Sequence, residues 1–183
     1  IKNVGLNQSR KGLIEVLILM GANINIKNQR KVSNEIVGDV CVKSSKLNGV
    51  NVSDDIIPNI IDEIPILSIA ACFAEGKTVI KNAAELRVKE SDRLHAISEG
   101  LMKLKIEHKI FEDGISIRGT SDEIRCYETI DSFDDHRIAM SFLVSGIRSE
   151  NNIRVRNCGN IETSFPNFRH IMNALGMKIN EED

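Results

Sequence analysis

The chain has 183 residues, enough for one large domain or two small ones. Hydrophobic residues make up 42% and charged residues 27%, and the formal net charge of -2 with no Trp and one Tyr argues against a broad nucleic-acid interface. Apolar runs of membrane-spanning length and a signal peptide are both absent from the sequence, so we expect a cytoplasmic protein without a membrane partner.

Three segments of similar pattern recur along the chain, at residues 1–26, 80–110 and 155–180. Each opens with a short strand that ends in an asparagine, at Asn3, Asn82 or Asn157. A polar loop, a helix and a strand of alternating pattern follow in each segment. Repeats of this size indicate one supersecondary unit used several times.

Apolar spacing predicts the helices of these segments. The second segment carries one apolar stripe, at Leu94, Ile97, Leu101 and Leu104. The third segment carries a similar stripe, at Phe168, Ile171, Met172 and Leu175. We expect Ser164 to cap the third helix and Gly176 to end it. The three helices should end near Met20, Leu104 and Leu175.

Alternating patterns predict strands over residues 23–28, 37–43, 106–119 and 177–180, with a hairpin turn at Asp113-Gly114. A second kind of helix precedes the last two segments, at residues 62–76 and 135–146. Both stretches are apolar on nearly every face, so we expect them to be fully buried.

The first segment lacks such a buried helix, and the chain begins at Ile1 without an initiator Met. We therefore expect the front of the first unit to be missing from this sequence. The prediction is an α+β fold of repeated βαβαββ units, approximately residues 1–53, 54–125 and 126–183.

The four cysteines stand far apart, without a CxxC pair, at Cys41, Cys72, Cys126 and Cys158. Because a zinc site or a small disulfide framework needs closely spaced or paired cysteines, we expect reduced thiols. The histidines His95, His108 and His170 have no partners at metal-ligand spacing, so we expect them to be surface or packing residues. We predict no metal site.

Three charged residues, Lys89, Glu90 and Arg93, surround a predicted helix start near Ser91. The free N–H groups of a helix start attract anions, and a lysine and an arginine beside them could complete a phosphate or carboxylate site. Glu90 would repel such an anion, which makes sense if it transfers a proton. The alternative is an exposed, solvated helix start with i,i+3 ion pairs.

A similar choice exists at two other helix starts. Asp135 could cap a helix that begins with His136 and Arg137, where a cation is unfavourable unless it meets an anion. Surface decoration is the alternative. Asp62 heads another buried helix, where it could cap the helix or act as a general base.

Four motifs occur in a fixed order: "IDEIPILSIAACFAEG", "ELRVKESDRL", "DDHRIAMSFLVSG" and "TSFPNF". Together they resemble the C-terminal part of the 5-enolpyruvylshikimate-3-phosphate synthase family, over essentially all 183 residues. The sequences "DEIP", "RVKESDR" and "TSFP" resemble its bacterial class II branch. The resemblance implies that residues 1–183 form a single C-terminal domain with buried helices inside and sheets outside. It also implies an N-terminal domain that is absent from this chain.

The resemblance implies transfer of the enolpyruvyl group of phosphoenolpyruvate to the 5-hydroxyl of shikimate 3-phosphate, with release of phosphate and no cofactor. The intact enzyme would be a monomer, and this chain alone should have no appreciable turnover, because the family's active site lies between two domains. Two alternatives stay open: a transferase acting on UDP-N-acetylglucosamine, and a non-catalytic βαβαββ binding module.

The resemblance also implies roles for the charged residues at the three predicted helix starts. Asp62 matches the carboxylate that takes the 5-hydroxyl proton, and Glu90 matches the acid that protonates the methylene carbon of phosphoenolpyruvate. The residues matching substrate-binding positions are Lys89, Arg93, His136 and Arg137. One departure is Thr163, which stands where some members carry a lysine that contacts phosphoenolpyruvate.

Overall fold

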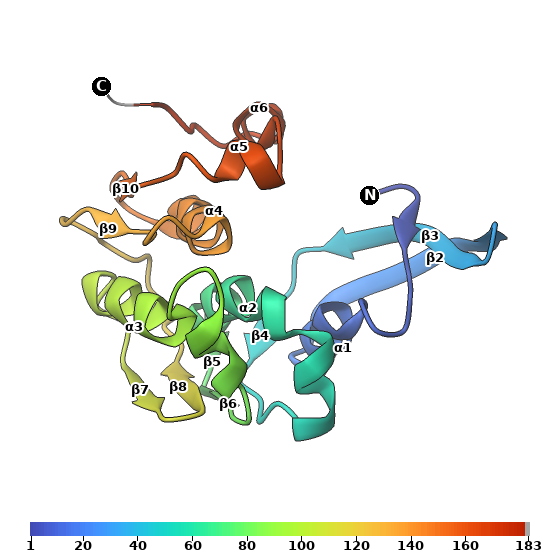
Figure 1. Ribbon diagram of the computed structural model, residues 1–183, viewed down its shortest axis with the longest axis horizontal. Helices are drawn as coiled ribbons and strands as arrows, with labels where there is room; N and C mark the ends of the chain where they lie inside the picture. The colour runs from blue at the N-terminus through green and yellow to red at the C-terminus, as the bar shows by residue number, and fades with distance from the viewer. Residues whose placement is uncertain (182–183) are drawn as a thin grey trace.

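The computed structural model describes residues 1–181 as an α+β fold, in which helices lie between small sheets (Figure 1). The first part contains β1 (Val4–Gly5), α1 (Gly12–Leu19), β2 (Asn23–Val32) and β3 (Glu35–Lys43). The three strands form an antiparallel sheet in the order β1-β3-β2. The predicted strands at 23–28 and 37–43 are therefore confirmed.

The central part begins with β4 (Leu47–Asn48), η1 (Asp54–Asn59), η2 (Ile61–Glu63), α2 (Ile64–Cys72), β5 (Ala74–Glu75) and β6 (Lys77–Ile80). It continues with η3 (Ala84–Val88), α3 (Arg93–Lys103), β7 (His108–Phe111) and β8 (Gly114–Arg118). β4 pairs in parallel with β5, and β6-β8-β7 form an antiparallel sheet. The predicted hairpin is confirmed, since Phe111 pairs with Gly114.

The last part contains β9 (Ile130–Asp131), α4 (His136–Ser145), η4 (Gly146–Arg148), β10 (Val155–Arg156), α5 (Ile161–Ser164) and α6 (Phe168–Ala174). β9 and β10 pair in parallel. The strand predicted at 177–180 is wrong, because these residues find no partner strand in the described part of the chain.

The predicted cap at Ser164 is also wrong. Ser164 ends α5, and the N-cap of α6 is Asn167, in a left-handed conformation with φ 70°. The physical reason is Pro166, whose ring disfavours helical geometry in the residue before it. Phe165 is accordingly non-helical, so the next helix cannot begin until the chain has passed the proline.

The structure repeats a backbone detail in all three segments. Asn3, Asn82 and Asn157 have positive φ angles of 57°, 54° and 62°. A nearby aspartate accepts a hydrogen bond from each asparagine, from the N–H of Asn3 and Asn82 and from Nδ2 of Asn157. The helices end as predicted, with Met20, Leu104 and Leu175 as their C-caps. Gly176 follows with φ 101°, as expected of a residue that ends a helix.

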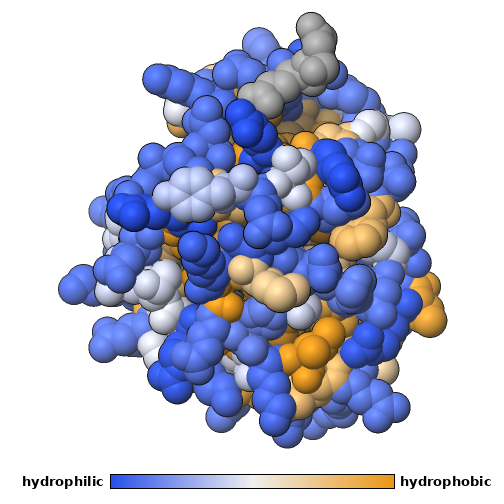
Figure 2. All heavy atoms as spheres, turned by 90° about the vertical axis from the view of Figure 1, so that its left-hand side faces the viewer, coloured by the Kyte–Doolittle hydropathy of each residue, from blue (hydrophilic) through white to orange (hydrophobic). Residues whose placement is uncertain are grey.

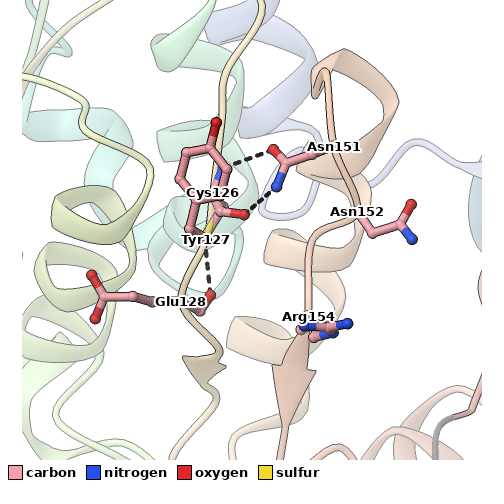
Figure 3. A pocket seen from close by; sticks show the side chains of 6 residues that line it. All are labelled: Cys126, Tyr127, Glu128, Asn151, Asn152 and Arg154. Atoms are coloured by element: carbon pink, nitrogen blue, oxygen red, sulfur yellow. Dashed lines mark hydrogen bonds between the residues drawn. The ribbon is translucent and has the colours of Figure 1, made fainter.

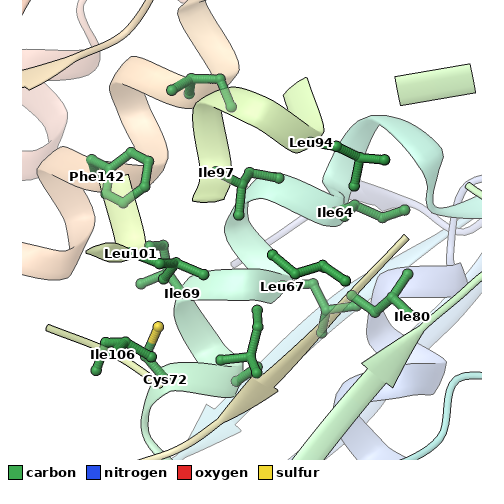
Figure 4. Close-up of a cluster of buried hydrophobic side chains, with 14 of the residues drawn as sticks. Ile64, Leu67, Ile69, Cys72, Ile80, Leu94, Ile97, Leu101, Ile106 and Phe142 are labelled. Atoms are coloured by element: carbon green, nitrogen blue, oxygen red, sulfur yellow. The ribbon is translucent and has the colours of Figure 1, made fainter. Parts of the chain in front are cut away.

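The main hydrophobic core surrounds α2 (Figure 4). Ile64 and Leu67 of α2 lie among apolar side chains of α3, β6 and β8, and Phe142 of α4 closes one side. The predicted stripe of α3 is buried, at Leu94, Ile97, Leu101 and Leu104. The prediction that the helix at 62–76 is buried is thus confirmed for most of α2.

The expectation that the helix at 135–146 is fully buried holds only in part. α4 buries one face, with Ile138 and Phe142, while Leu143 and Val144 are half-buried against the small cluster around Phe168. The stripe of α6 lies mostly outside the core, and Leu175 is 75% exposed.

The face on the side of α3 and β9 is mostly hydrophilic with scattered apolar side chains (Figure 2). Among residues 1–181, no helix has the length and apolarity needed to cross a membrane.

Candidate active site at three helix starts

Five of the six predicted site residues come together where three helices begin. Asp62 lies in η2, directly before α2. Lys89 and Glu90 lie in the turn before α3, Arg93 is the first residue of α3, and Arg137 is the second residue of α4. The sixth, His136, begins α4 beside Arg137. Because α2, α3 and α4 pack on one another, their first turns bring these residues into one cluster.

Arg93 is the centre of this cluster. Its side chain is 1% exposed, and its guanidinium contacts three carboxylates. Nε donates to Asp135 Oδ2 at 2.7 Å, Nη1 to Asp62 Oδ1 at 3.0 Å and Nη2 to Glu90 Oε2 at 2.5 Å. A solvated helix start does not describe this residue, because an exposed i,i+3 pair would leave the arginine in water.

Asp62 is surrounded by cations. Lys89 Nζ lies 3.5 Å from Oδ1, and Arg137 Nη2 lies 3.9 Å from Oδ2. Burial alone would raise the pKa of this carboxyl, but the charges of Arg137 and Lys89 and the hydrogen bond from Arg93 outweigh burial and hold the pKa below its usual value. Capping does not explain Asp62, since the N-cap of α2 is Glu63, whose side chain makes no capping hydrogen bond.

Lys89 also contacts a residue that the sequence reasoning missed. Its ammonium group donates to Glu85, four residues earlier, as well as approaching Asp62. The hydrogen bond to Glu85, together with Asp62, raises the pKa of Lys89 above its usual value, so the lysine is protonated at neutral pH. The i,i+4 spacing of Glu85 and Lys89 was the available signal.

Arg137 bridges two helix starts. Its Nη1 donates to the backbone oxygen of Asp62 at 3.0 Å and lies 3.4 Å from Glu63 Oε1. Asp135 caps α4 as predicted, since Oδ1 accepts from the N–H groups of Arg137 at 2.8 Å and Ile138 at 3.3 Å. The bond from Arg93 to this cap was not anticipated, because the two residues lie 42 positions apart.

A hollow of about 310 Å³ opens beside Asp62, at the low end of ligand-pocket volumes. Its lining residues are Ser9, Arg10, Pro58, Asn59, Ile61, Asp62 and Glu63. The sequence reasoning missed Ser9 and Arg10, which belong to the first repeated segment. The signal was their place in the polar loop before a helix, which corresponds to that of Lys89 in the second segment.

A second hollow, of about 140 Å³, is lined by none of the residues of the charged cluster. Figure 3 shows its lining residues, which are Cys126, Tyr127, Glu128, Asn151, Asn152 and Arg154. Asn151 lines it and joins two segments, since its Oδ1 accepts from the N–H of Cys126 at 3.0 Å. Burial raises the pKa of the Cys126 thiol, which disfavours the reactive thiolate. We interpret this hollow as structural. Within residues 1–181, no group of three or more His, Cys, Asp or Glu side chains could hold a metal ion.

The arrangement combines two chemical capacities. Lys89 and Arg137 are partly exposed cations that can bind phosphate and carboxylate groups, and Arg offers a planar fork for both. Arg93 is buried, and its guanidinium binds carboxylates of the protein itself. Asp62 and Glu90 are carboxylates that can accept or deliver protons, and both touch the same arginine. Such a site suits a reaction of anionic substrates that requires proton transfer.

Comparison with known proteins gives a consistent result. The family model described as EPSP synthase (3-phosphoshikimate 1-carboxyvinyltransferase) matches residues 1–172. Relatives named 3-phosphoshikimate 1-carboxyvinyltransferase include one from Petrotoga mobilis, 49% identical over 175 residues (96% of this chain, 40% of the relative). Another, from Magnetococcus marinus, is 42% identical over 181 residues (99% of this chain, 41% of the relative).

Solved structures agree with these relatives. The structure of an EPSP synthase from Acinetobacter baumannii matches with a TM-score of 0.96 and 40% sequence identity. The match covers 100% of this chain and 42% of the Acinetobacter baumannii chain. The enolpyruvyl transferase NikO from Streptomyces tendae has a TM-score of 0.68 at 16% identity over 98% of this chain and 39% of its own, a likeness of fold alone. The chain therefore spans about two fifths of the length of the relatives that it matches.

Proposed function

The chain belongs to the EPSP synthase family, and we propose on that premise that it carries one side of an enolpyruvyl transferase active site. The reaction is transfer of the enolpyruvyl group of phosphoenolpyruvate to the 5-hydroxyl of shikimate 3-phosphate, a step of the shikimate pathway toward aromatic amino acids. The observation that carries this proposal is the convergence of Asp62, Glu90 and three cations at the starts of α2, α3 and α4.

In this proposal Lys89 and Arg137 hold the phosphate and carboxylate of phosphoenolpyruvate. Lys89 and Arg137 have side chains 21% and 32% exposed, so an anion can reach them from solvent. Arg93 is buried and already oriented by its carboxylate partners. Its guanidinium holds Asp62 and Glu90 in place before the substrate arrives, which favours catalysis through positioning.

Glu90 delivers a proton to the methylene carbon of phosphoenolpyruvate. Its side chain is 52% exposed, so a substrate can reach it from solvent. The neighbouring carbon becomes oxocarbenium-like and is attacked by the 5-hydroxyl oxygen, whose proton passes to Asp62. Removal of a proton from the new methyl group by Glu90 then expels phosphate and restores the carbon–carbon double bond.

Asp62 has a lowered pKa, which makes it ionised but a weak base. The same cations that depress this pKa are those proposed to bind phosphoenolpyruvate. A bound dianion would pair with Lys89 and Arg137 and weaken their attraction to Asp62. The pKa of Asp62 would then rise, which makes the carboxylate a stronger base. Substrate binding and base activation are thereby coupled.

The test is phosphate release from phosphoenolpyruvate and shikimate 3-phosphate. Since the chain spans about two fifths of its relatives, it would be mixed with the part of the Acinetobacter baumannii protein that lies outside the matched region. We expect release by the mixture and little by this chain alone. A folded complex that releases no phosphate would overturn the proposal, and release with UDP-N-acetylglucosamine as acceptor would favour the other transferase.

A further inference from the structure

Asp135 is a carboxylate that a substrate cannot reach. Its exposed fraction is 0%, and both of its oxygens are occupied by groups of the protein. Oδ1 accepts from the N–H groups of Arg137 and Ile138 at the start of α4. Oδ2 accepts from Arg93 Nε at 2.7 Å and from Ser91 Oγ at 3.2 Å, both from the start of α3.

Capping alone does not account for this residue. A serine or threonine would cap α4 nearly as well and would avoid burying a charge. A buried carboxylate is unfavourable unless a cation and hydrogen bonds compensate it. Here the compensation comes from Arg93, whose side chain is also 1% exposed. The pair thus ties the first turn of α3 to the first turn of α4.

The ion pair with Asp135 determines the orientation of the Arg93 guanidinium. With Nε held by Asp135, the two Nη groups turn toward Asp62 and Glu90, at 3.0 and 2.5 Å. On the other side, Oδ1 of Asp135 holds the backbone of Arg137. One buried carboxylate therefore orients the arginine between the two proton-transferring residues and anchors a substrate-binding residue as well.

We propose that Asp135 is a positioning residue of the active site, acting through Arg93 on Asp62 and Glu90. The expected effect on turnover rests on the proposed function, whereas the orientation of Arg93 by Asp135 follows from the contacts alone. A merely structural cap would affect stability; a positioning residue also affects the residues that Arg93 holds.

The test compares two aspartates that each cap a helix and pair with an arginine, Asp135 and Asp92. Asp135→Ser keeps a good N-cap for α4 and removes the carboxylate from Arg93. Asp92→Ser is the matched control, because Asp92 caps α3 through the N–H of His95 and pairs with an arginine, Arg87, that lies outside the cluster. Circular dichroism and thermal unfolding would first establish that both variants are folded.

Two readouts follow. Carbon-13 NMR of this chain alone measures the titration midpoint of the Asp62 carboxyl, which should rise in Asp135→Ser, since Asp62 loses its hydrogen bond from Arg93, and stay in place in Asp92→Ser. In the complemented mixture, Asp135→Ser should lower kcat by about 100-fold, the scale of an ångström-sized misplacement, with a much smaller change for the control.

An unchanged Asp62 midpoint in folded Asp135→Ser would overturn the inference, as would equal losses of kcat in the two variants. If the unmodified mixture releases no phosphate, the proposed function fails, and the Asp62 midpoint by itself decides whether Asp135 positions Arg93.

Discussion

Arg93 donates from Nη1 to Asp62 Oδ1 at 3.0 Å, across 31 positions of the chain. The contact joins the start of α3 to the turn before α2 and places a cation against the residue proposed as general base. The arginine is thus satisfied by carboxylates rather than open to solvent. Its orientation is set by the fold before any ligand arrives.

Replacing Arg93 should strongly destabilise the fold. Arg93→Met keeps the length of the side chain but leaves Asp135 buried without its cation, and breaking a buried pair in this way typically costs about 3–5 kcal/mol. Urea denaturation would measure the loss. Arg118→Met is the control, because Arg118 pairs with Glu107 at the surface, where both side chains are more than half exposed. An exposed pair contributes about 0–1 kcal/mol. Equal losses in the two variants would contradict the buried network.

The stabilising contribution of Asp62 should depend on pH. Its pKa is lower in the folded chain than the usual value, so the folded state favours the ionised form. The contribution is therefore present above the unfolded-state pKa of about 3.9 and is lost as the pH falls through the folded-state pKa. Asp62→Asn should be less stable than the native chain at pH 7, and the difference should shrink in acid.

Urea denaturation of both proteins from pH 7 down to pH 3 measures this difference. Asp122→Asn, a substitution on an exposed loop, controls for removal of one negative charge. A difference between native chain and Asp62→Asn that stays constant over the whole range would show that the surrounding cations do not stabilise the Asp62 carboxylate.

Local patterns predicted the local features of this chain. The stripe from Leu94 to Leu104 and the hairpin before Gly114 depend on neighbours within a few residues, and both are confirmed. The burial of Arg93 was not predictable in this way, because its partners lie 31 and 42 positions away and only the packing of three helices brings them together. Ser164 failed as a cap because one proline outweighed the general preference of serine for that position.

The proposed proton donor should be dispensable for folding but not for turnover. Glu90→Gln keeps the size of a side chain that is 52% exposed, and Asp62 and Asp135 still neutralise Arg93, so the free energy of unfolding should fall less than in Arg93→Met. Turnover should fall by about 100- to 10,000-fold, the range for loss of a general acid. Glu107→Gln, another exposed partner of an arginine, should leave turnover unchanged. Native-like phosphate release by Glu90→Gln in the complemented mixture would remove Glu90 from the mechanism.

The close approach of α3 and α4, on which the site depends, can be tested at Gly100. A Cβ added there would lie 2.0 Å from Cζ of Phe142, a distance that forces the ring or a helix to move. In an ordinary helix interior, Gly→Ala stabilises by about 1 kcal/mol. Overpacking of a core typically costs about 1–3 kcal/mol, so the clash should reverse the sign, and Gly100→Ala should unfold at lower urea concentration.

A double-mutant cycle with Phe142→Leu separates the two effects. The smaller side chain removes the ring that the new methyl group meets, so Gly100→Ala should be less destabilising in that background than alone. Gly159→Ala, where an added Cβ meets nothing within 4 Å, is the control for the substitution itself. If Gly100→Ala instead stabilises the native chain, α3 and α4 are farther apart than described. The same result would contradict the contact between Arg93 and Asp135, which spans the same two helices.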